Sequence, residues 1–210
     1  MSASPRRRSR AAVDSQNVGR LFLRRLLQEH ASLLREVVEL RGLRDDAYHD
    51  PLTGLRNARY LDMRLREELA RGGSDGAGTG ALVLLDVEGM ARLNRRHGRA
   101  AGDSALRWLG RQLLATVRAS DVCCRTGGDA FALILPDTDR AGAETTIFRV
   151  NQAVGAADGE DWKPLPLRGG LATWPKDARD AAALLEHALQ SLAEDRRRHR
   201  DGRPGLRLVP

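Results

Sequence analysis

A short run of apolar residues at Ala81–Leu85, followed directly by Asp86, limits the folds open to this chain more than any other feature. A continuous apolar run of this length, bounded by glycine and aspartate, is typical of a β-strand that is buried on both faces. Such a strand lies inside a sheet whose two faces both need a cover. Segments with helical spacing lie on either side of the run, so we expect an α/β domain with helices flanking a central sheet.

The other elements alternate between helical and extended patterns. Helices are expected over 60–71, 89–96, 104–117, 141–154 and 181–198, and strands over 122–125, 131–135 and 169–174. Gly127 and Gly128 lie between two of the apolar runs, which indicates a tight β-hairpin. The sheet is therefore expected to be mixed.

The chain before Asp50 is expected to form a tail and a helix. Residues 1–17, rich in Ser, Pro and Arg, are predicted to be a disordered basic tail. Over 18–49 the apolar residues recur at alternating steps of three and four, which predicts a helical, coiled-coil-like stalk. Periodicity fits two roles equally well, packing against its own domain or pairing with a second copy in a parallel coiled coil. Pro51 and Gly54 end the helical pattern, so a domain is expected over 50–203, followed by a C-terminal tail over 204–210.

Composition argues against several classes of partner. The formal net charge is +7, but residues 1–44 carry +6 and residues 196–210 carry +5, so the residues between them carry −4. Because the basic residues gather in the two ends, a nucleic-acid partner is not expected. The apolar runs are far shorter than the ~20 residues of a membrane span, and no secretory signal pattern follows Met1. We therefore expect a cytoplasmic protein without a membrane span, in which the adjacent Cys123 and Cys124 pack as buried residues.

Two aspartates are the first candidates for chemistry. Asp86 comes at the carboxyl end of a predicted buried strand, and Asp129 comes at the tip of the glycine hairpin. If the hairpin and the strand are neighbours, the two carboxylates converge, and such a pair suits Mg²⁺ that shares substrate phosphates. Gly127 and Gly128 would let a phosphate approach the backbone closely. Taken singly, each aspartate is more often a turn or cap residue.

Several segments, in order, resemble the GGDEF family, the diguanylate cyclases that join two GTP molecules into cyclic di-GMP. The resemblance runs from about Asp50 to at least Pro175. The segments that carry it are Asp50–Asn57 (DPLTGLRN), Asp86–Asn94 (DVEGMARLN) with Gly98, Gly102 and Asp103, Arg125–Phe131 (RTGGDAF), and Leu171–Pro175 (LATWP). The resemblance implies a nucleotidyl-cyclase-like fold.

The same resemblance implies roles for individual residues. Asp86 and Asp129 would be metal ligands, assisted by the carbonyl of Val87, with Mg²⁺ as the cofactor if GTP is bound, and Asp129 would also be the catalytic residue. The guanine readers would be Asn94 and Asp103, an assignment that suits the donors and acceptors of guanine. The phosphates would lie along Gly127 and Gly128.

The reaction of this family implies a pair of domains. A 3′-hydroxyl of one GTP attacks the α-phosphorus of the other, so the protein positions the two nucleotides and neutralises developing charge. Each domain holds one GTP, so two must meet face to face. This favours a homodimer formed through residues 18–49.

The sequence also departs from the family pattern at the reacting end. Ala130 stands where the family has Glu, Met90 and Ala91 where Phe-Lys is usual, and Arg95 where Asp is usual. Near the end, Gln190 replaces a Tyr and Ala193 replaces a phosphate-contacting Lys. Arg196 or Arg197, one turn further on, is an available substitute for the lost cation. Losses of this kind commonly cost ~10²- to 10³-fold in rate each.

A second site of the family, the product-binding inhibitory site, is an Arg-x-x-Asp placed just before the hairpin. Arg118 and Asp121 occupy that place. Arg can grip the O6/N7 edge of guanine, and Asp can accept from its N1/N2 edge. The alternative for this pair is a solvated turn, because Arg-x-x-Asp arises by chance in a chain so rich in Arg.

Three functions remain open from the sequence. The leading hypothesis is a degenerate GGDEF-domain signalling protein that binds cyclic di-GMP, and GTP as a second ligand, with little or no cyclase activity, and that signals to its dimer mate or to an unidentified protein. The first rival is an active diguanylate cyclase that works with Asp86 and Asp129 alone. The second is a ligand-free protein-interaction module that binds through its stalk and basic tails.

Overall fold

The computed structural model describes residues 25–37, 47–73, 78–155 and 165–200. The chain divides into two compact units, Met1–Ala47 and Tyr48–Pro210. The predicted tails over 1–17 and 204–210 lie outside the described residues, and the domain bounds of 50–203 stay a prediction. Among the described helices, none combines the length and apolar character needed to span a bilayer.

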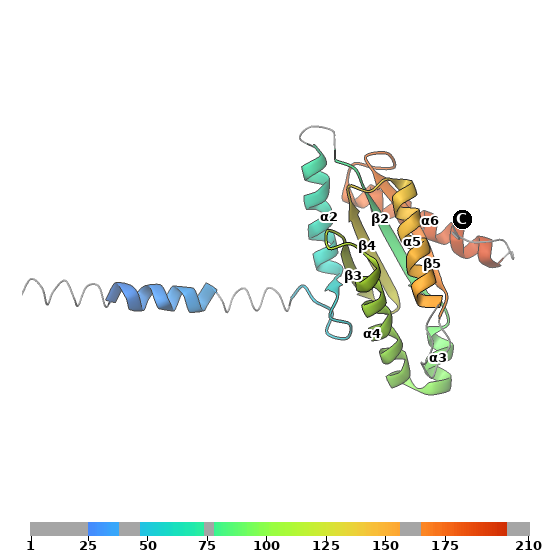
Figure 1. Ribbon diagram of the computed structural model, residues 1–210, viewed down its shortest axis with the longest axis horizontal. Helices are drawn as coiled ribbons and strands as arrows, with labels where there is room; N and C mark the ends of the chain where they lie inside the picture. Colours follow the sequence, from blue (N-terminus) through green and yellow to red (C-terminus); the bar gives the residue numbers. More distant parts are fainter. Residues whose placement is uncertain (1–24, 38–46, 74–77, 156–164, 201–210) are drawn as a thin grey trace, which may run out of the picture. The chain divides into compact units, whose positions relative to one another are not determined.

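The second unit is a five-stranded mixed sheet with helices on both faces, which confirms the predicted fold class (Figure 1). The elements in chain order are β1 (Arg56–Asn57), α2 (Ala58–Gly73), β2 (Gly80–Val87), α3 (Met90–His97), α4 (Arg99–Thr116), β3 (Val122–Gly127), β4 (Ala130–Pro136), α5 (Arg140–Gly155), β5 (Leu167–Trp174) and α6 (Ala181–Arg200). The strand order is β1-β3-β4-β2-β5, with β1 parallel to β3 and every other pair antiparallel.

The central strand β2 shows why both faces need helices. Its side chains alternate between two apolar clusters, so that Val83 and Leu85 enter one while Leu82 and Leu84 enter the other. Helices α4 and α5 cover the first cluster, and α2 and α6 cover the second. The uniformly apolar run seen in the sequence is thus a strand buried on both sides.

Helix α6 lies unusually close to the edge strand β5. A Cβ atom added to Gly170 would lie 2.2 Å from the carbonyl oxygen of Ala188 and 2.6 Å from the backbone nitrogen of Leu192. Two strand N–H groups donate to α6 side chains: Gly169 to Oδ2 of the buried Asp195 at 3.3 Å, and Leu171 to Oγ of Ser191 at 3.1 Å. Because α6 accepts these edge donors, the strand is closed to further pairing.

The first unit contains a helix over 25–37, which lies inside the stalk predicted over 18–49. Apolar side chains along it are exposed: Leu26, Leu27, Leu33, Leu34 and Val37. An ion pair between Arg25 and Glu29, one turn apart, supports the helix only weakly because both side chains are solvated.

Two details of the fold differ from expectation. Helix α4 begins at Arg99 rather than near 104, because Gly98, at φ +83°, provides the whole break after α3 and the next helix starts at once. Strand β1 was not predicted, since two residues carry no period of their own and their ladder partners, Cys124 and Arg125, lie far along the chain.

Candidate functional site

Asp86 and the glycine hairpin meet at one end of the sheet. Strands β2 and β4 are antiparallel neighbours, and Asp86 lies directly opposite Ala130. The N–H of Val87 donates to the carbonyl oxygen of Asp129 at 3.1 Å, which fastens the hairpin to the end of β2. The geometric condition set by the sequence, that hairpin and strand be neighbours, is therefore met, while the roles of these residues stay predictions.

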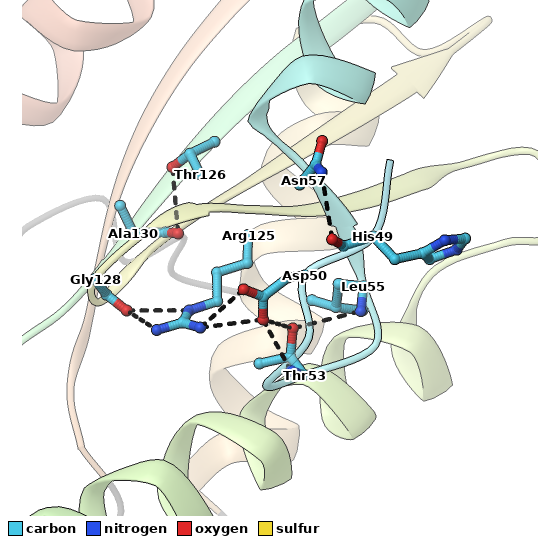
Figure 2. Close-up of polar contacts among 9 residues, drawn as sticks. All are labelled: His49, Asp50, Thr53, Leu55, Asn57, Arg125, Thr126, Gly128 and Ala130. Carbon is cyan, nitrogen blue, oxygen red and sulfur yellow. Dashed lines mark hydrogen bonds and ion pairs between the residues drawn. The ribbon is translucent and has the colours of Figure 1, made fainter. Parts of the chain in front are cut away.

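An arginine next to the hairpin donates hydrogen bonds to the backbone at its tip (Figure 2). Arg125 donates from Nε and Nη2 to the carbonyl oxygen of Gly128 at 3.1 and 2.6 Å. Its Nη1 lies 3.0 Å from both carboxylate oxygens of Asp50. Gly128 has φ +53°, a conformation that glycine adopts without strain. Arg125 thus ties the hairpin tip to the turn that opens the domain.

Asp50 belongs to that opening turn and is charged in the folded protein. Burial by itself raises the pKa of Asp50, but hydrogen bonds from the hydroxyl and N–H of Thr53 and the ion pair with Arg125 outweigh it, leaving the pKa below its ordinary value. The Thr53 N–H and hydroxyl donate to Oδ1 at 2.8 and 2.7 Å. The opening signature DPLTGL and the hairpin motif are therefore parts of one network.

Two carboxylates at the end of β2 are already paired with arginines. Arg196 Nη2, from α6, lies 2.7 Å from Oδ1 of Asp86. Arg168, from β5, donates from Nη2 to Oε2 of Glu88 at 2.9 Å, and its Nε lies 2.9 Å from Oε1 at an angle too poor for a second hydrogen bond. The bond from Arg168 holds the pKa of Glu88 below its ordinary value against the effect of burial, and the charges of His199 and Arg196 act in the same direction.

This donor set is a poor fit to Mg²⁺. The ion takes about six oxygen ligands in near-octahedral geometry. Among the residues that the structure describes, no three His, Cys, Asp or Glu side chains gather where they could hold a metal. Of the three predicted ligands, Asp86 is already paired with a guanidinium, Val87 offers only its backbone, and Asp129 brings a single carboxylate that has no ion pair with any described residue. Ala130, opposite Asp86, adds no oxygen from its side chain.

The predicted guanine readers lie together at the junction of α3 and α4. A Cβ atom added to Gly102 would lie 1.9 Å from Oδ1 of Asn94, so the Asn94 side chain rests directly on this glycine. That Oδ1 atom is buried and has no hydrogen-bond partner among the described residues. Asp103, the next residue of α4, is exposed. The Oδ1 atom of Asn94 is covered by the protein, so of these two groups the exposed carboxylate of Asp103 is the one that can accept hydrogen bonds from a ligand.

Arg118 and Asp121 form a tight turn between α4 and β3. The carboxylate of Asp121 accepts from the N–H of Arg118 at 2.8 Å and from the hydroxyl of Ser120 at 3.3 Å. The side chain of Arg118 is exposed, and the structure gives it no ion pair within the described residues. A carboxylate has about four lone-pair sites, so Asp121 can accept further bonds while it holds the turn.

This turn lies at the opposite end of β3 from the hairpin. The strand has six residues, and at about 3.3 Å per residue they separate the turn from the hairpin by roughly 20 Å. Arg149 of α5 donates to the carbonyl oxygen of Thr116 and brings a second arginine to this end of α4. Sequence reasoning missed Arg149, because its relation to α4 depends on how two helices pack.

Sequence reasoning also missed the partner of Arg196. It identified Arg196 and Arg197 as available cations near the predicted phosphate site, and it predicted Asp86 to be a metal ligand. The structure pairs Arg196 with Asp86 instead. The remaining reacting-end substitutions, at Ala130, Gln190 and Ala193, offer no charge to that pair.

Comparison with known proteins agrees with this geometry. Residues 47–202 match the family described as diguanylate cyclase, GGDEF domain. The chain is 32% identical over 164 residues to diguanylate cyclase DgcP of Pseudomonas aeruginosa, covering 77% of this chain and 24% of that protein. It is 34% identical over 144 residues to the probable diguanylate cyclase DgcE of Escherichia coli, covering 69% of this chain and 12% of that protein. The chain therefore spans a quarter or less of the length of these two relatives.

Solved structures show the same architecture. The coiled coil and GGDEF domain of DgcB from Caulobacter crescentus, in complex with c-di-GMP, matches with a TM-score of 0.73 and 26% identity over 85% of this chain and 94% of that chain. Diguanylate cyclase SiaD from Pseudomonas aeruginosa, in complex with its activator SiaC, matches with a TM-score of 0.66 and 26% identity over 91% of this chain and 80% of that chain. On the match over 47–202 and these structures, the chain belongs to the diguanylate cyclase GGDEF-domain family.

Proposed function

We propose that this chain is a degenerate GGDEF-domain signalling module that binds cyclic di-GMP, and GTP as a second ligand, with little or no cyclase activity. The observation that carries the proposal is the contrast between the two ends of β3. At the hairpin end, Ala130 faces an Asp86 already neutralised by Arg196. At the other end, the Arg118–Asp121 turn presents an exposed guanidinium beside a carboxylate with acceptor capacity left.

The loss of cyclase activity follows from the chemistry at the hairpin end. Phosphoryl transfer depends on positioning and on cations that neutralise developing charge. Asp129 stays in place, but the acid at position 130 is absent, and so is the lysine that Ala193 replaces. Mg²⁺ is the metal expected with GTP in this family, yet the carboxylates present here are poorly arranged for it.

The proposed GTP site uses residues that the substitutions leave intact, at the α3–α4 junction and in the glycine hairpin. Guanine would lie against Asn94 and Asp103, where the exposed carboxylate of Asp103 can accept hydrogen bonds. The phosphates would lie near Gly127 and Gly128, around which the structure leaves open space.

The proposed inhibitory-type site would bind cyclic di-GMP through Arg118 and Asp121. The DgcB structure in complex with c-di-GMP supports a ligand of this class. A bidentate arginine–guanine contact is worth about 1–3 kcal/mol, so Arg118→Ala should weaken binding roughly 5- to 150-fold. Calorimetry with cyclic di-GMP measures this loss, and Arg111→Ala, which removes an exposed arginine from the preceding α4 helix, is the matched control.

The stalk supports a dimeric form of the module. The helix over 25–37 exposes a row of leucines that a second copy would cover in a coiled coil. The module would pass ligand occupancy to this dimer mate or to an unidentified protein partner. A nucleotide ligand of this kind places the module in the cytoplasm.

One set of assays separates the three hypotheses. The proposal expects cyclic di-GMP to bind and GTP with Mg²⁺ to yield no product by mass spectrometry. Cyclic di-GMP formed at rates usual for an enzyme would establish the cyclase instead, and Ala130→Glu should then raise the rate. If neither nucleotide gives heat in the calorimeter, the ligand-free interaction module is the remaining hypothesis.

A further inference from the structure

Charged side chains at the carboxyl end of β2 balance one another without a metal. Asp86 is paired with Arg196 at 2.7 Å, and Glu88 with Arg168 at 2.9 Å. His199 Nε2 lies 3.9 Å from Oε2 of Glu88. Each carboxylate that projects from this strand end therefore has a guanidinium from a neighbouring element, β5 or α6.

The position of Arg196 is fixed by the packing of α6. Gly170 lets α6 lie against the backbone of β5. Asp195, the residue before Arg196 in α6, is buried and accepts a hydrogen bond from the N–H of Gly169. Asp86 lies beside Arg168 in the β2–β5 ladder, on the sheet face that α6 covers. The packing of α6 therefore brings the backbone of Arg196 close to the end of β2, and the Arg196 side chain, 48% exposed, reaches Asp86 from there.

A guanidinium on Asp86 and a divalent cation at the same carboxylate exclude each other. The ion pair gives Asp86 its neutralising charge in advance, and a metal ion entering there would have to displace Arg196 and would be repelled by it. Arg196 has five N–H donors, and the contact with Asp86 is the one that the structure gives it. The others remain able to donate to an anion.

The surface next to this pair is an open pocket that suits a phosphate. It is lined by Glu88, Ala193, Arg196 and Arg197, so two arginines face a single acid that is itself paired with Arg168. Arg197 is exposed and has no ion pair with any described residue. The small side chain of Ala193 leaves room between the charged groups.

We propose that Arg196 takes the place of a divalent cation at Asp86, so that this chain binds the triphosphate of a nucleotide without Mg²⁺. The inference deepens the GTP side of the proposed function and rests on it. It concerns the end of the sheet at Asp86 and makes no use of the Arg118–Asp121 turn.

Calorimetry of GTP binding in excess EDTA and in excess Mg²⁺ tests the proposal on the unmodified protein. We expect the two dissociation constants to agree within about threefold, because one charge-assisted contact, worth about tenfold, is already supplied by the protein. Binding that appears only with Mg²⁺, or that tightens tenfold or more, would overturn the proposal, and so would the absence of GTP binding in both buffers. Cyclic di-GMP titrated into the same sample reports on the Arg118–Asp121 site, so failure here is distinguishable from failure of the proposed regulatory function.

Three variants locate the effect. Arg196→Gln should weaken binding in EDTA about tenfold or more and make it depend on Mg²⁺. Asp86→Asn gives the sharpest contrast: if Asp86 is the counterion of Arg196, binding in EDTA is kept or tightened severalfold, whereas an Asp86 that holds a metal predicts loss. Arg198→Gln is the matched control, because Arg198 lies two residues on and makes only a 3.9 Å pair with Glu194. Circular dichroism confirms folding, and equal behaviour of the two arginine variants would refute the assignment.

Discussion

The ion pair between Asp50 and Arg125 provides a direct test of how burial changes the value of a salt bridge. Nη1 of Arg125 lies 3.0 Å from both oxygens of Asp50, and the two side chains are 12% and 17% exposed. Arg66 and Asp62 on α2 make a pair with the same distances, 3.0 Å from Nε to each oxygen, but their side chains are 67% and 61% exposed. The chain therefore holds two ion pairs of matched distance and different burial.

The expected magnitudes follow from that difference. Removing one partner of a buried pair costs about 3–5 kcal/mol, and an exposed pair on a helix is worth about 0.3–0.5 kcal/mol. Asp50 keeps its two hydrogen bonds from Thr53 when Arg125 is lost, and both side chains are partly solvated, so the expected cost lies at or below the lower end of that range. We expect Arg125→Met to lower the free energy of unfolding by about 2–3 kcal/mol, or Tm by roughly 4–12 °C, and Arg66→Met, which breaks a solvated pair, to have a much smaller effect.

Urea unfolding followed by circular dichroism measures both variants. A double-mutant cycle of Arg125→Met with Asp50→Asn should give a coupling energy of about 1–2 kcal/mol. Methionine retains most of the arginine stem, so lost packing contributes little. Equal destabilisation by the two methionine variants, or additive effects in the cycle, would refute the argument that this network holds the hairpin.

Three further predictions concern other parts of the chain. Gly170→Ala should destabilise the domain by about 1–3 kcal/mol in urea unfolding, because its Cβ would meet α6 backbone at 2.2 Å, while Gly169→Ala, with its nearest neighbours at 3.8 Å, serves as control. Leu33→Glu should shift a dimer towards monomer in sedimentation equilibrium, whereas Gln28→Glu adds the same charge away from the apolar row and should not. Asp50 and Glu88 both have a lowered pKa, so their stabilising effect is full above their ordinary pKa values, near pH 4, and is lost as pH falls through the lowered values; a Tm that does not fall with pH in this range would contradict this.

Local patterns in the sequence predicted most of the sheet and helices. The continuous apolar run of β2 and the glycines of the hairpin are properties of short segments, so they can be recognised without knowing which elements pack together. Strand β1 could not be predicted, because its two residues become a strand only by pairing with β3. The start of α4 was misplaced because Gly98 ends one helix and begins the next, a geometry that composition does not reveal.

The candidate site was predictable in its membership but not in its pairings. The motifs identified Asp86, Asn94 and Asp103, and the substitution at Ala130 was visible by inspection. The pairing of Arg196 with Asp86 depends on the depth at which α6 packs on β5, which is a property of the fold. An arginine-rich chain offers many cations, and sequence alone cannot say which one reaches a given carboxylate.

The pairing of Arg196 bears on the proposal that this domain binds a nucleotide without converting it. A cation speeds phosphoryl transfer only if it stabilises the transition state more than the bound substrate. Arg196 is already committed to Asp86 and would interact with bound phosphates before reaction as strongly as during it. An interaction that stabilises the bound substrate and the transition state equally raises the affinity for the nucleotide but leaves the activation barrier of the bound nucleotide unchanged. On this proposal, the pairing of Arg196 with Asp86 favours a receptor over an enzyme. It leaves the Arg118–Asp121 turn, at the far end of β3, undisturbed.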